Sequence, residues 1–530
     1  MGKGSIVVKL FGKLCALFSA IFLAFKNSFI YRLVCSLADG TAGSYKKSAC
    51  HGVLTSPDVE RHSEGSKFYR VFSAFTGKVT SLSDKLFGFF ERAAKNSGAA
   101  KLMSFFAQAF RTSFIGKRLC KAYCAYTAFF GFVIAVMFCV PHSFWNNLFG
   151  LAIALVSLMI VLYGVYKKKD NVKISPDKTY LSLILFFACL VISTVLSQDR
   201  GDSIRVLMFF VTSFILCISV SVFTANKESL RSFCGMLFAA VAVTGVIGIV
   251  QAIIGVEADA SLTDLTLNAD MPGRIFSTMG NANNFAQMLV LFMPYCAAFA
   301  LTAKSAKKKL VLLAMLALPF AALLATYSRS GWIAFAVAVA VFVALSNRRV
   351  VPALIIICIV AIPFLPQSVL NRILTIGNLS DSSSSYRLVI WQGALEMLSN
   401  WWRIGLGIGP GAFKSVYPAY ARGNTQDIAH CHMQFMEVFL ETGLLGFICF
   451  VCLTFSLIKR AFVSTSSKDK DIKYFGAAAA ASMTSIVFIG FFEYYWFYPR
   501  VMFSFFISAG LAISVYRLYG ENKKKEQSAE

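Results

Sequence analysis

Residues 233–254 read FCGMLFAAVAVTGVIGIVQAII, an apolar stretch without a charged side chain. A helix needs about 20 apolar residues to cross roughly 30 Å of hydrocarbon, so this stretch predicts a membrane-spanning helix. The rest of the chain has the same character, because 57% of its 530 residues are hydrophobic, 15% are charged, and the mean hydropathy is +0.66. This composition excludes most classes of soluble protein.

Similar apolar runs recur from residue 122 onward, and they predict an all-α integral membrane protein with about twelve transmembrane helices. The seventh, eighth and ninth runs are short, which is typical of partly spanning or re-entrant helices. The runs cover residues 122–140, 147–166, 179–197, 204–224, 233–254, 285–303, 310–326, 331–345, 350–366, 434–458, 474–492 and 501–517.

The loops between these runs differ in charge. With residue 121 placed in the cytoplasm, the inside loops and tail hold 22 Lys and Arg, whereas the outside loops hold nine. Positive residues favour the cytoplasmic side, so both ends of the membrane domain are predicted inside. This topology explains the formal net charge of +25 better than nucleic-acid binding does, and we expect no nucleic-acid partner.

The chain divides into three predicted regions. Residues 1–121, with 19 basic and 6 acidic residues, resemble cationic amphipathic helices that lie on anionic membrane lipids at the cytoplasmic face. Residues 122–517 form the membrane domain, and residues 518–530 form a charged cytoplasmic tail. Residues 367–433 are the long polar segment between spans, and we predict an extracytoplasmic loop that contains amphipathic helices and carries the chemistry.

Eight of the nine outside basic residues are arginines. A guanidinium presents a planar fork that matches phosphate, so arginines on the side where topology disfavours positive charge are candidates for binding an anion. Local ion pairs with Asp270, Asp381 or Glu493 explain these arginines about equally well.

One of these arginines, Arg387, lies in the first turns of a predicted helix. Residues 381–385 offer N-cap side chains, and Leu388, Trp391 or Gln392, Leu395 and Leu398 recur at helical spacing. The amide dipoles at the start of that helix also favour an anion. The alternative is an arginine that snorkels from an interfacial helix.

The glycine run GLGIGPG at residues 405–411 superficially suggests nucleotide binding. No predicted strand precedes it and no βαβ unit surrounds it, so we predict instead a tight loop in which backbones approach closely.

Two of the five histidines, His430 and His432, precede the tenth run. A metal site, a general base and polar caps of a helix are the three possible roles. On a helix the two side chains would point about 200° apart, which disfavours a metal site and lets at most one face a given reacting atom. Histidine titrates near neutral pH, which suits removal of a proton from a sugar hydroxyl.

Four stretches together resemble the O-antigen ligase and polymerase superfamily of membrane glycosyltransferases. They are RIFSTMGNAN at 274–283, YSRSGW at 327–332, SYRLVIW at 385–391 with the glycine run, and HCH at 430–432 leading to ETGLLG at 441–446. The resemblance covers about residues 270–450. Met433 and residues 401–403 depart from the usual family pattern.

This resemblance implies a bacterial inner-membrane, multi-pass enzyme of cell-envelope polysaccharide biosynthesis with an extracytoplasmic active site. Its donor would be a glycan on polyprenyl (undecaprenyl) diphosphate, and its acceptor a hydroxyl of a glycan, lipid or protein. The reaction would proceed with inversion and without a metal or cofactor. By resemblance, the catalytic residues are His432, Arg387 and Arg329, and the substrate-binding residues are Arg274, His430, Tyr327, Glu441 and Arg403.

Two alternatives stay open at this point. A polymerase of lipid-linked repeat units would carry the same motifs as a ligase. A transporter or flippase of lipid-linked sugars would place ionisable residues near mid-membrane, whereas the arginines here gather at one surface.

Overall fold

The computed structural model describes residues 125–166, 178–256, 273–374, 382–399 and 401–529, with scattered positions before residue 109. Every regular element among these residues is a helix, as the sequence predicts. The N-terminal region at 1–121 lies almost entirely outside the described residues, and so do Asp270 and Asp381.

Each of the twelve apolar runs coincides with a helix. The seventh run is covered by two consecutive helices, and the ninth by a short helix that ends in a 3-10 turn. The helices are α8 (Ala125–Cys139), α9 (Asn147–Tyr166), α10 (Lys178–Val195), α11 (Arg200–Phe223), α12 (Lys227–Ile254), α13 (Ala282–Leu301), α14 (Ala306–Met315) with α15 (Ala317–Ala325), α16 (Arg329–Asn347), α17 (Val351–Ala361), α22 (Gln434–Ser464), α23 (Lys470–Ile489) and α24 (Pro499–Ala529).

Among the described residues, eight helical segments are long and apolar enough to cross a membrane, and α8, α9 and α10 are shorter apolar helices. The seventh and eighth runs belong to the eight, because the helices cover residues 306–325 and 329–350. The helical segments that contain these two runs are therefore longer than the runs themselves. The predicted tail is also not separate, since α24 continues from the last apolar run to Ala529.

The chain forms two compact units. The first contains the described positions before residue 57 and residues 343–366, with α17 and the 3-10 turns η2 (Arg348–Val350) and η3 (Ile362–Phe364). The second contains the remaining residues and all the candidate site residues described below.

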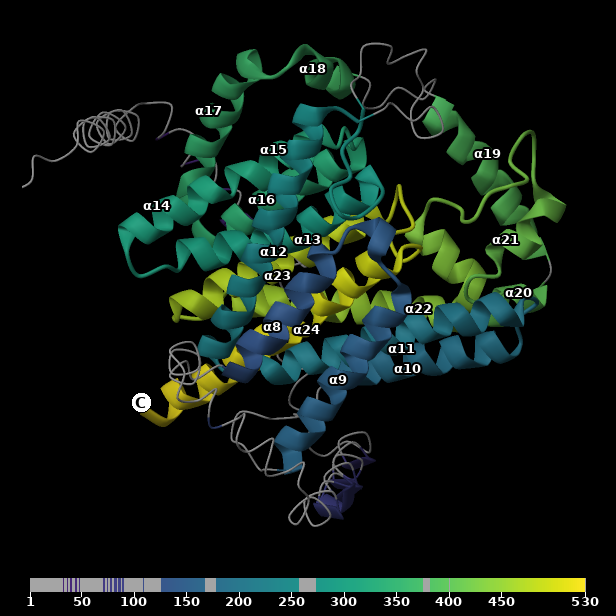
Figure 1. The fold of residues 1–530 in the computed structure, drawn as a ribbon, viewed down its shortest axis with the longest axis horizontal. Coiled ribbons are helices and arrows are strands. Elements are labelled where there is room, and N and C mark those ends of the chain that lie inside the picture. The colour runs from purple at the N-terminus through teal and green to yellow at the C-terminus, as the bar shows by residue number, and fades with distance from the viewer. Residues whose placement is uncertain are drawn as a thin grey trace, which may run out of the picture. The chain divides into compact units, whose positions relative to one another are not determined.

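The core of the second unit is built around α13 and α24 (Figure 1). α13 packs on α23 and α12, and α24 packs on α11. Buried small residues at 477–481 of α23 let backbones approach closely, which is how helices associate where lipid is as apolar as the side chains. Ser482 Oγ donates to the Leu291 carbonyl oxygen at 2.8 Å, and Tyr295 donates to the Ser508 carbonyl oxygen at 3.1 Å.

Several helix ends meet at one end of this unit. The backbone N–H of Gln434, which starts α22, donates to the carbonyl oxygen of Gly490 after α23 at 2.8 Å. The N–H of Ile275, before α13, donates to the carbonyl oxygen of Ala325 at the end of α15 at 3.3 Å. The starts of α13 and α22 thus lie beside the ends of α15 and α23, and this end carries the candidate site.

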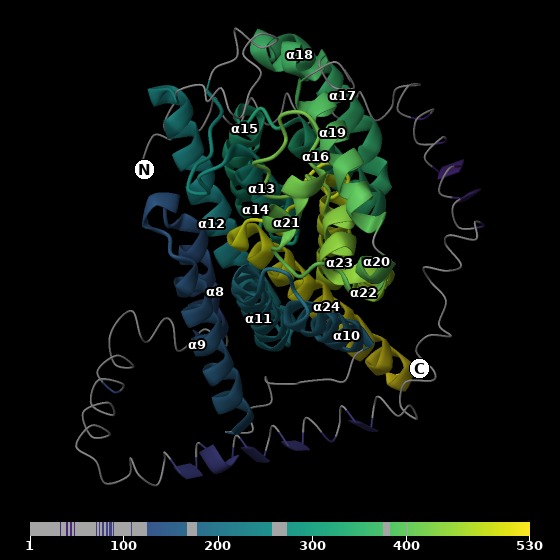
Figure 2. The same ribbon diagram turned by 90° about the vertical axis from the view of Figure 1, so that its right-hand side faces the viewer.

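The predicted loop at 367–433 contains short helices, visible in green in Figure 2. In α19, Leu388 and Leu395 are exposed, whereas Trp391 is partly buried and packs against an apolar cluster. The buried side chains of α19, Ile390 and Ala394, lie on the same helix face as Arg387, and Met397 of the following 3-10 turn is buried as well. The elements are α18 (Gln367–Leu374), α19 (Ser382–Glu396), η4 (Met397–Ser399), α20 (Trp401–Leu406), α21 (Phe413–Val416) and η5 (Tyr417–Tyr420).

The buried face of α19 belongs to an apolar cluster that ties the loop to the membrane helices. Tyr417 from η5, Cys431 beside the histidines and Leu440 of α22 are all buried in it. Because Arg387 shares that face, the packing directs Arg387 inward and not toward solvent.

Candidate functional site

The glycine run lies directly on α22. The N–H groups of Ile408 and Gly409 donate to the carbonyl oxygens of Leu440 and Glu441, at 2.9 and 3.0 Å. A Cβ on Gly407 would lie 2.3 Å from the Glu441 carbonyl oxygen, so only glycine allows this approach. The structure therefore confirms the prediction of a tight loop with close backbone contact.

The side chain of Glu441 anchors the same loop. Its Oε1 accepts from the N–H of Gly411 at 2.6 Å, and its Oε2 accepts from the hydroxyl of Tyr494 at 3.1 Å. Glu441 is buried by these contacts. These two contacts indicate that Glu441 holds the glycine run in place.

Arg274 is held at the start of α13. Its Nε donates to the Thr326 carbonyl oxygen at 2.9 Å, and its Nη2 donates to Oδ1 of Asn283 at 2.5 Å. The pKa of Arg274 is lowered to about 10, mainly by burial and then by the positive charges of Arg372, Arg329 and Arg387, which outweigh the opposing charge of Glu493. Four arginines from separate segments therefore share one electrostatic environment.

The YSRSGW stretch supplies the turn between α15 and α16. Tyr327 has a φ of 49°, and its hydroxyl lies 2.9 Å from the hydroxyl of Ser368 in α18. Arg372, also in α18, is buried and donates from Nε to the Tyr327 carbonyl oxygen at 3.5 Å. These contacts place α18 and Arg372 against Tyr327, two residues before Arg329, which is the first residue of α16.

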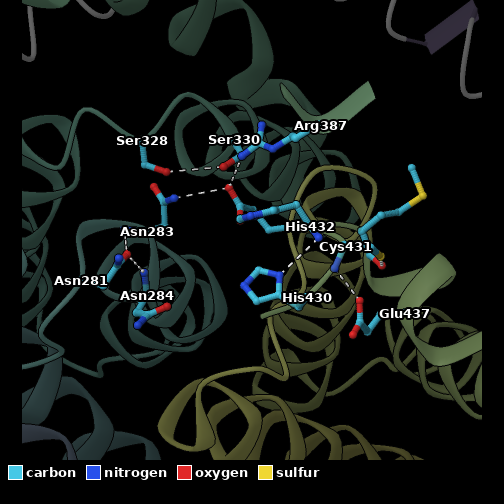
Figure 3. A network of polar contacts seen from close by, with 12 residues as sticks. Asn281, Asn283, Asn284, Ser328, Ser330, Arg387, His430, Cys431, His432 and Glu437 are labelled. Atoms are coloured by element: carbon cyan, nitrogen blue, oxygen red, sulfur yellow. Dashed lines mark hydrogen bonds and ion pairs between the residues drawn. The ribbon is translucent and has the colours of Figure 1, made fainter. Parts of the chain in front are cut away.

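Glu493, between α23 and α24, is the centre of the polar network. Its Oε1 lies 2.7 Å from Nη2 of Arg387 and accepts from Nδ2 of Asn283 at 3.3 Å. Its Oε2 lies 3.7 Å from Nδ1 of His432. Asn283, Arg387 and His432 visibly converge from three different segments (Figure 3).

The charge of Glu493 is stabilised by these neighbours. Burial by itself would raise the pKa of this carboxyl group, but Arg387, His432 and His430 together hold it at about 2. Glu493 is thus ionised throughout the physiological range. The pairing of Arg387 with Glu493 is the local ion pair that the sequence left as an alternative.

The histidines do not lie on a helix, contrary to the sequence prediction. Residues 428–433 are non-helical, and the ring centroids of His430 and His432 are only 4.2 Å apart. Both side chains therefore face the same region, so the expectation of divergent side chains was wrong. His432 has a φ of 55°, and its N–H donates to Nδ1 of His430 at 3.2 Å.

Contacts from two sides hold this segment. Trp391 of α19 donates from Nε1 to the Cys431 carbonyl oxygen at 2.9 Å, and the N–H of Cys431 donates to Oε2 of Glu437 at 2.6 Å. Burial lowers the pKa of His430 to about 3, with the neighbouring His432 adding to the effect. His430 is consequently neutral at physiological pH, and its Nδ1 is available as the acceptor that fixes the His432 backbone.

Three non-glycine residues of the described chain have a positive φ, and all three fall in the motifs. They are Ser277, Tyr327 and His432. Such conformations cost on the order of 1–3 kcal/mol each and persist only where the surroundings enforce them. Their concentration in three converging segments supports a functional site there.

The structure gathers most of the sequence candidates. Arg274, Arg329, Arg387, His430 and His432 share one site, whereas Glu441 supports the glycine run behind it. The backbone of Arg403 lies in α20, and its side chain lies outside the described residues.

Sequence reasoning did not assign Arg372, Asn283 or Glu493 to the site. Glu493 was considered only as an ion-pair partner, although a lone carboxylate among aromatic residues at a helix end was a usable signal. In the described residues, no group of three or more His, Cys, Asp or Glu side chains has an arrangement that could hold a metal ion.

Taken together, the eight long apolar helices make the chain a multi-pass membrane protein. Residues 313–451 match the family model described as O-antigen ligase, so this part of the chain is similar to that family. Three of the four resembling stretches fall inside this match, and the stretch at 274–283 precedes it. No curated protein matches the chain.

Proposed function

We propose that the protein transfers a glycan from a polyprenyl diphosphate, such as undecaprenyl diphosphate, to an acceptor hydroxyl on the extracytoplasmic face of a bacterial inner membrane. The observation that carries the proposal is the convergence of four arginines, two histidines and one ionised glutamate at one end of the membrane helices. The charge bias of the loops supports the extracytoplasmic side for this end.

The arginines suit a diphosphate. Arg274, Arg329, Arg372 and Arg387 share one environment, and Glu493 forms an ion pair with Arg387 of this group. A diphosphate is a multivalent anion, and guanidinium groups bind its oxygens through paired hydrogen bonds. The site adjoins apolar helices, so a lipid carrier can present its phosphates there while its chain stays in hydrocarbon.

The reaction follows from the positions of His432 and Glu493. Nε2 of His432 takes the proton of the acceptor hydroxyl, and the acceptor oxygen forms a bond to the anomeric carbon. The bond from that carbon to the diphosphate oxygen breaks, and the leaving diphosphate keeps the electron pair. The arginines stabilise the developing negative charge, and attack opposite the leaving group inverts the anomeric carbon.

Glu493 and His430 act as positioning residues. The Glu493 carboxylate faces Nδ1 of His432, which leaves Nε2 directed to the acceptor and stabilises the imidazolium that forms. His430, held neutral by burial, accepts the His432 N–H and maintains its left-handed conformation.

The test is transfer in proteoliposomes from a glycan on undecaprenyl diphosphate. We expect His432→Ala and Arg387→Ala each to lower turnover by about 10²-fold or more. Arg422→Ala is the matched control, because Arg422 pairs with Glu396 on the exposed surface of the same loop. Full activity in both site variants would disprove the assigned roles, and loss of activity with EDTA would refute a metal-independent reaction.

The products of the same assay separate ligation from polymerisation. Ligation gives one addition to an acceptor without a prenyl group, whereas a polymerase gives a ladder of repeat units on the lipid carrier. Movement of the donor across the bilayer without a new glycosidic bond would identify a transporter and overturn the proposal.

A further inference from the structure

A cavity of about 340 Å³ lies among the helices α13, α14, α15 and α16. Its lining is apolar throughout, with residues such as Pro294, Leu316, Phe335 and Ala338. The proposed reaction uses none of these side chains.

Breaks in the helices create this space. α13 contains Pro294, and α14 ends at Met315 just before α15 begins at Ala317. Proline removes a hydrogen bond from the ladder of a helix and commonly kinks it, which can leave space beside a neighbouring helix. α14 has no buried residue. The second half of α14, residues 310–315, is apolar and has no buried residue, so with a cavity beside it this half is suited to flank a hydrocarbon chain.

The cavity lies beneath the arginine cluster on the same helices. α13 begins next to Asn283, and Pro294 follows eleven residues later, or about 16 Å along the helix axis. α16 begins at Arg329, and its lining residues from Phe335 to Phe342 lie about 9–20 Å along that axis. Half of the hydrocarbon thickness is about 15 Å, so the cavity extends across the membrane midplane.

The depth of the cavity in the membrane determines which hydrocarbon chains can reach it. A phospholipid chain anchored at the same surface ends near the midplane, because each leaflet fills half of the core. An undecaprenyl chain is several times longer than a leaflet is deep, and it reaches past the midplane when its diphosphate is held by Arg329.

We propose that this cavity binds the far isoprene units of the donor's polyprenyl chain and thereby selects long-chain carriers. The inference rests on the proposed function for the position of the diphosphate. Lipid tails are as apolar as the lining, so burial from water supplies no driving force here. The selectivity arises from van der Waals packing in the cavity, and it is therefore modest, about tenfold in kcat/KM.

The direct test is photolabelling of the full-length protein in proteoliposomes with undecaprenyl diphosphate that carries a diazirine on its terminal isoprene unit. We expect label in residues 313–320 and 335–342, and competition by unlabelled undecaprenyl diphosphate but not by farnesyl diphosphate. Label spread evenly over the lipid-facing helices would overturn the inference. So would equal labelling of these residues by a diazirine phospholipid that undecaprenyl diphosphate does not displace.

A pair of variants tests the cavity itself. Ala317 lines the cavity and is exposed, so Ala317→Trp fills the space without entering the packed core. Ala340 of α16 is exposed but does not line the cavity, which makes Ala340→Trp the matched control. We expect Ala317→Trp to lower labelling and to abolish the roughly tenfold preference for undecaprenyl-linked over farnesyl-linked glycan, and Ala340→Trp to change neither.

The two readouts separate the two proposals. Cavity labelling without glycan transfer from any donor would refute the proposed function and leave the chain-binding site in place. Transfer that is indifferent to chain length, with label outside the cavity, would refute the site and leave the function in place.

Discussion

Replacement of Glu493 by glutamine has opposite expected effects on diphosphate binding and on turnover. Glu493→Gln removes the negative charge that lies 2.7 Å from Nη2 of Arg387 but retains a side chain of the same size. When no ligand is bound, Arg387 in the variant has lost the carboxylate that balances its positive charge. Removing one partner of a buried ion pair costs about 3–5 kcal/mol, so we expect lower thermal stability of the empty protein.

The same substitution should strengthen the binding of a diphosphate, because it removes a negative charge that repels the phosphates. A phosphate on Arg387 would lie about 6 Å from the Glu493 carboxylate, and two unit charges repel by about 3 kcal/mol at that distance with an effective dielectric constant of 20. Solvent screening makes that figure an upper limit, so we expect undecaprenyl diphosphate to bind about tenfold more tightly to the variant.

Turnover should change in the other direction. His432 loses the carboxylate 3.7 Å from its Nδ1, which orients the ring and stabilises its protonated form. We expect kcat to fall by about 10²-fold. The assays are thermal unfolding with and without undecaprenyl diphosphate, a direct binding titration, and initial rates of transfer. Glu396→Gln, which removes an exposed carboxylate paired with Arg422, is the control.

Two results would refute this reasoning. Weaker diphosphate binding in Glu493→Gln, comparable to that of Arg387→Ala, would show that Glu493 holds the arginines in place for the anion and does not compete with it. An unchanged kcat would show that His432 needs no support from this carboxylate.

Three further predictions concern single positions. Arg372→Ala should weaken undecaprenyl diphosphate binding about tenfold, as a titration against Arg422→Ala would show; equal affinities would remove Arg372 from the anion site. Gly443→Ala places a Cβ 2.3 Å from a backbone oxygen of the glycine run and should abolish folded protein on size-exclusion chromatography, whereas Gly423→Ala, with a positive φ but nothing within 4 Å, should cost only about 1 kcal/mol. Burial depresses the pKa of His430 from 6.5 to about 3, so its neutral form contributes stability above pH 6.5 that is lost as the pH falls toward 3; His430→Gln should flatten thermal stability across that range, and an unchanged acid loss would contradict the assignment.

The loop predictions show where sequence patterns stop being sufficient. The spacing of Leu388, Leu395 and Leu398 correctly indicated a helix but did not show which residues are buried, because tertiary packing buries Ile390 and Ala394 and leaves Leu388 and Leu395 exposed. Helical periodicity assumes that the most apolar stripe faces the core. At a membrane surface, exposed leucines are also stable, so that assumption fails.

The histidines illustrate the same limit. A helical reading separated His430 and His432, but a left-handed residue and a hydrogen bond from Trp391 fold the segment so that both rings meet. The bond comes from a residue about 40 positions away, and local spacing contains no information about it.

The sequence by itself determined that the chain is helical, where its apolar helices lie, and which motifs carry arginine and histidine. These properties depend on the length and apolarity of continuous runs, both of which are local. Only the tertiary structure decided that Arg372, Asn283 and Glu493 join the site, and that a cavity lies beneath it. Those features arise where ends of different helices meet, and the meeting is set by packing between residues far apart in the chain.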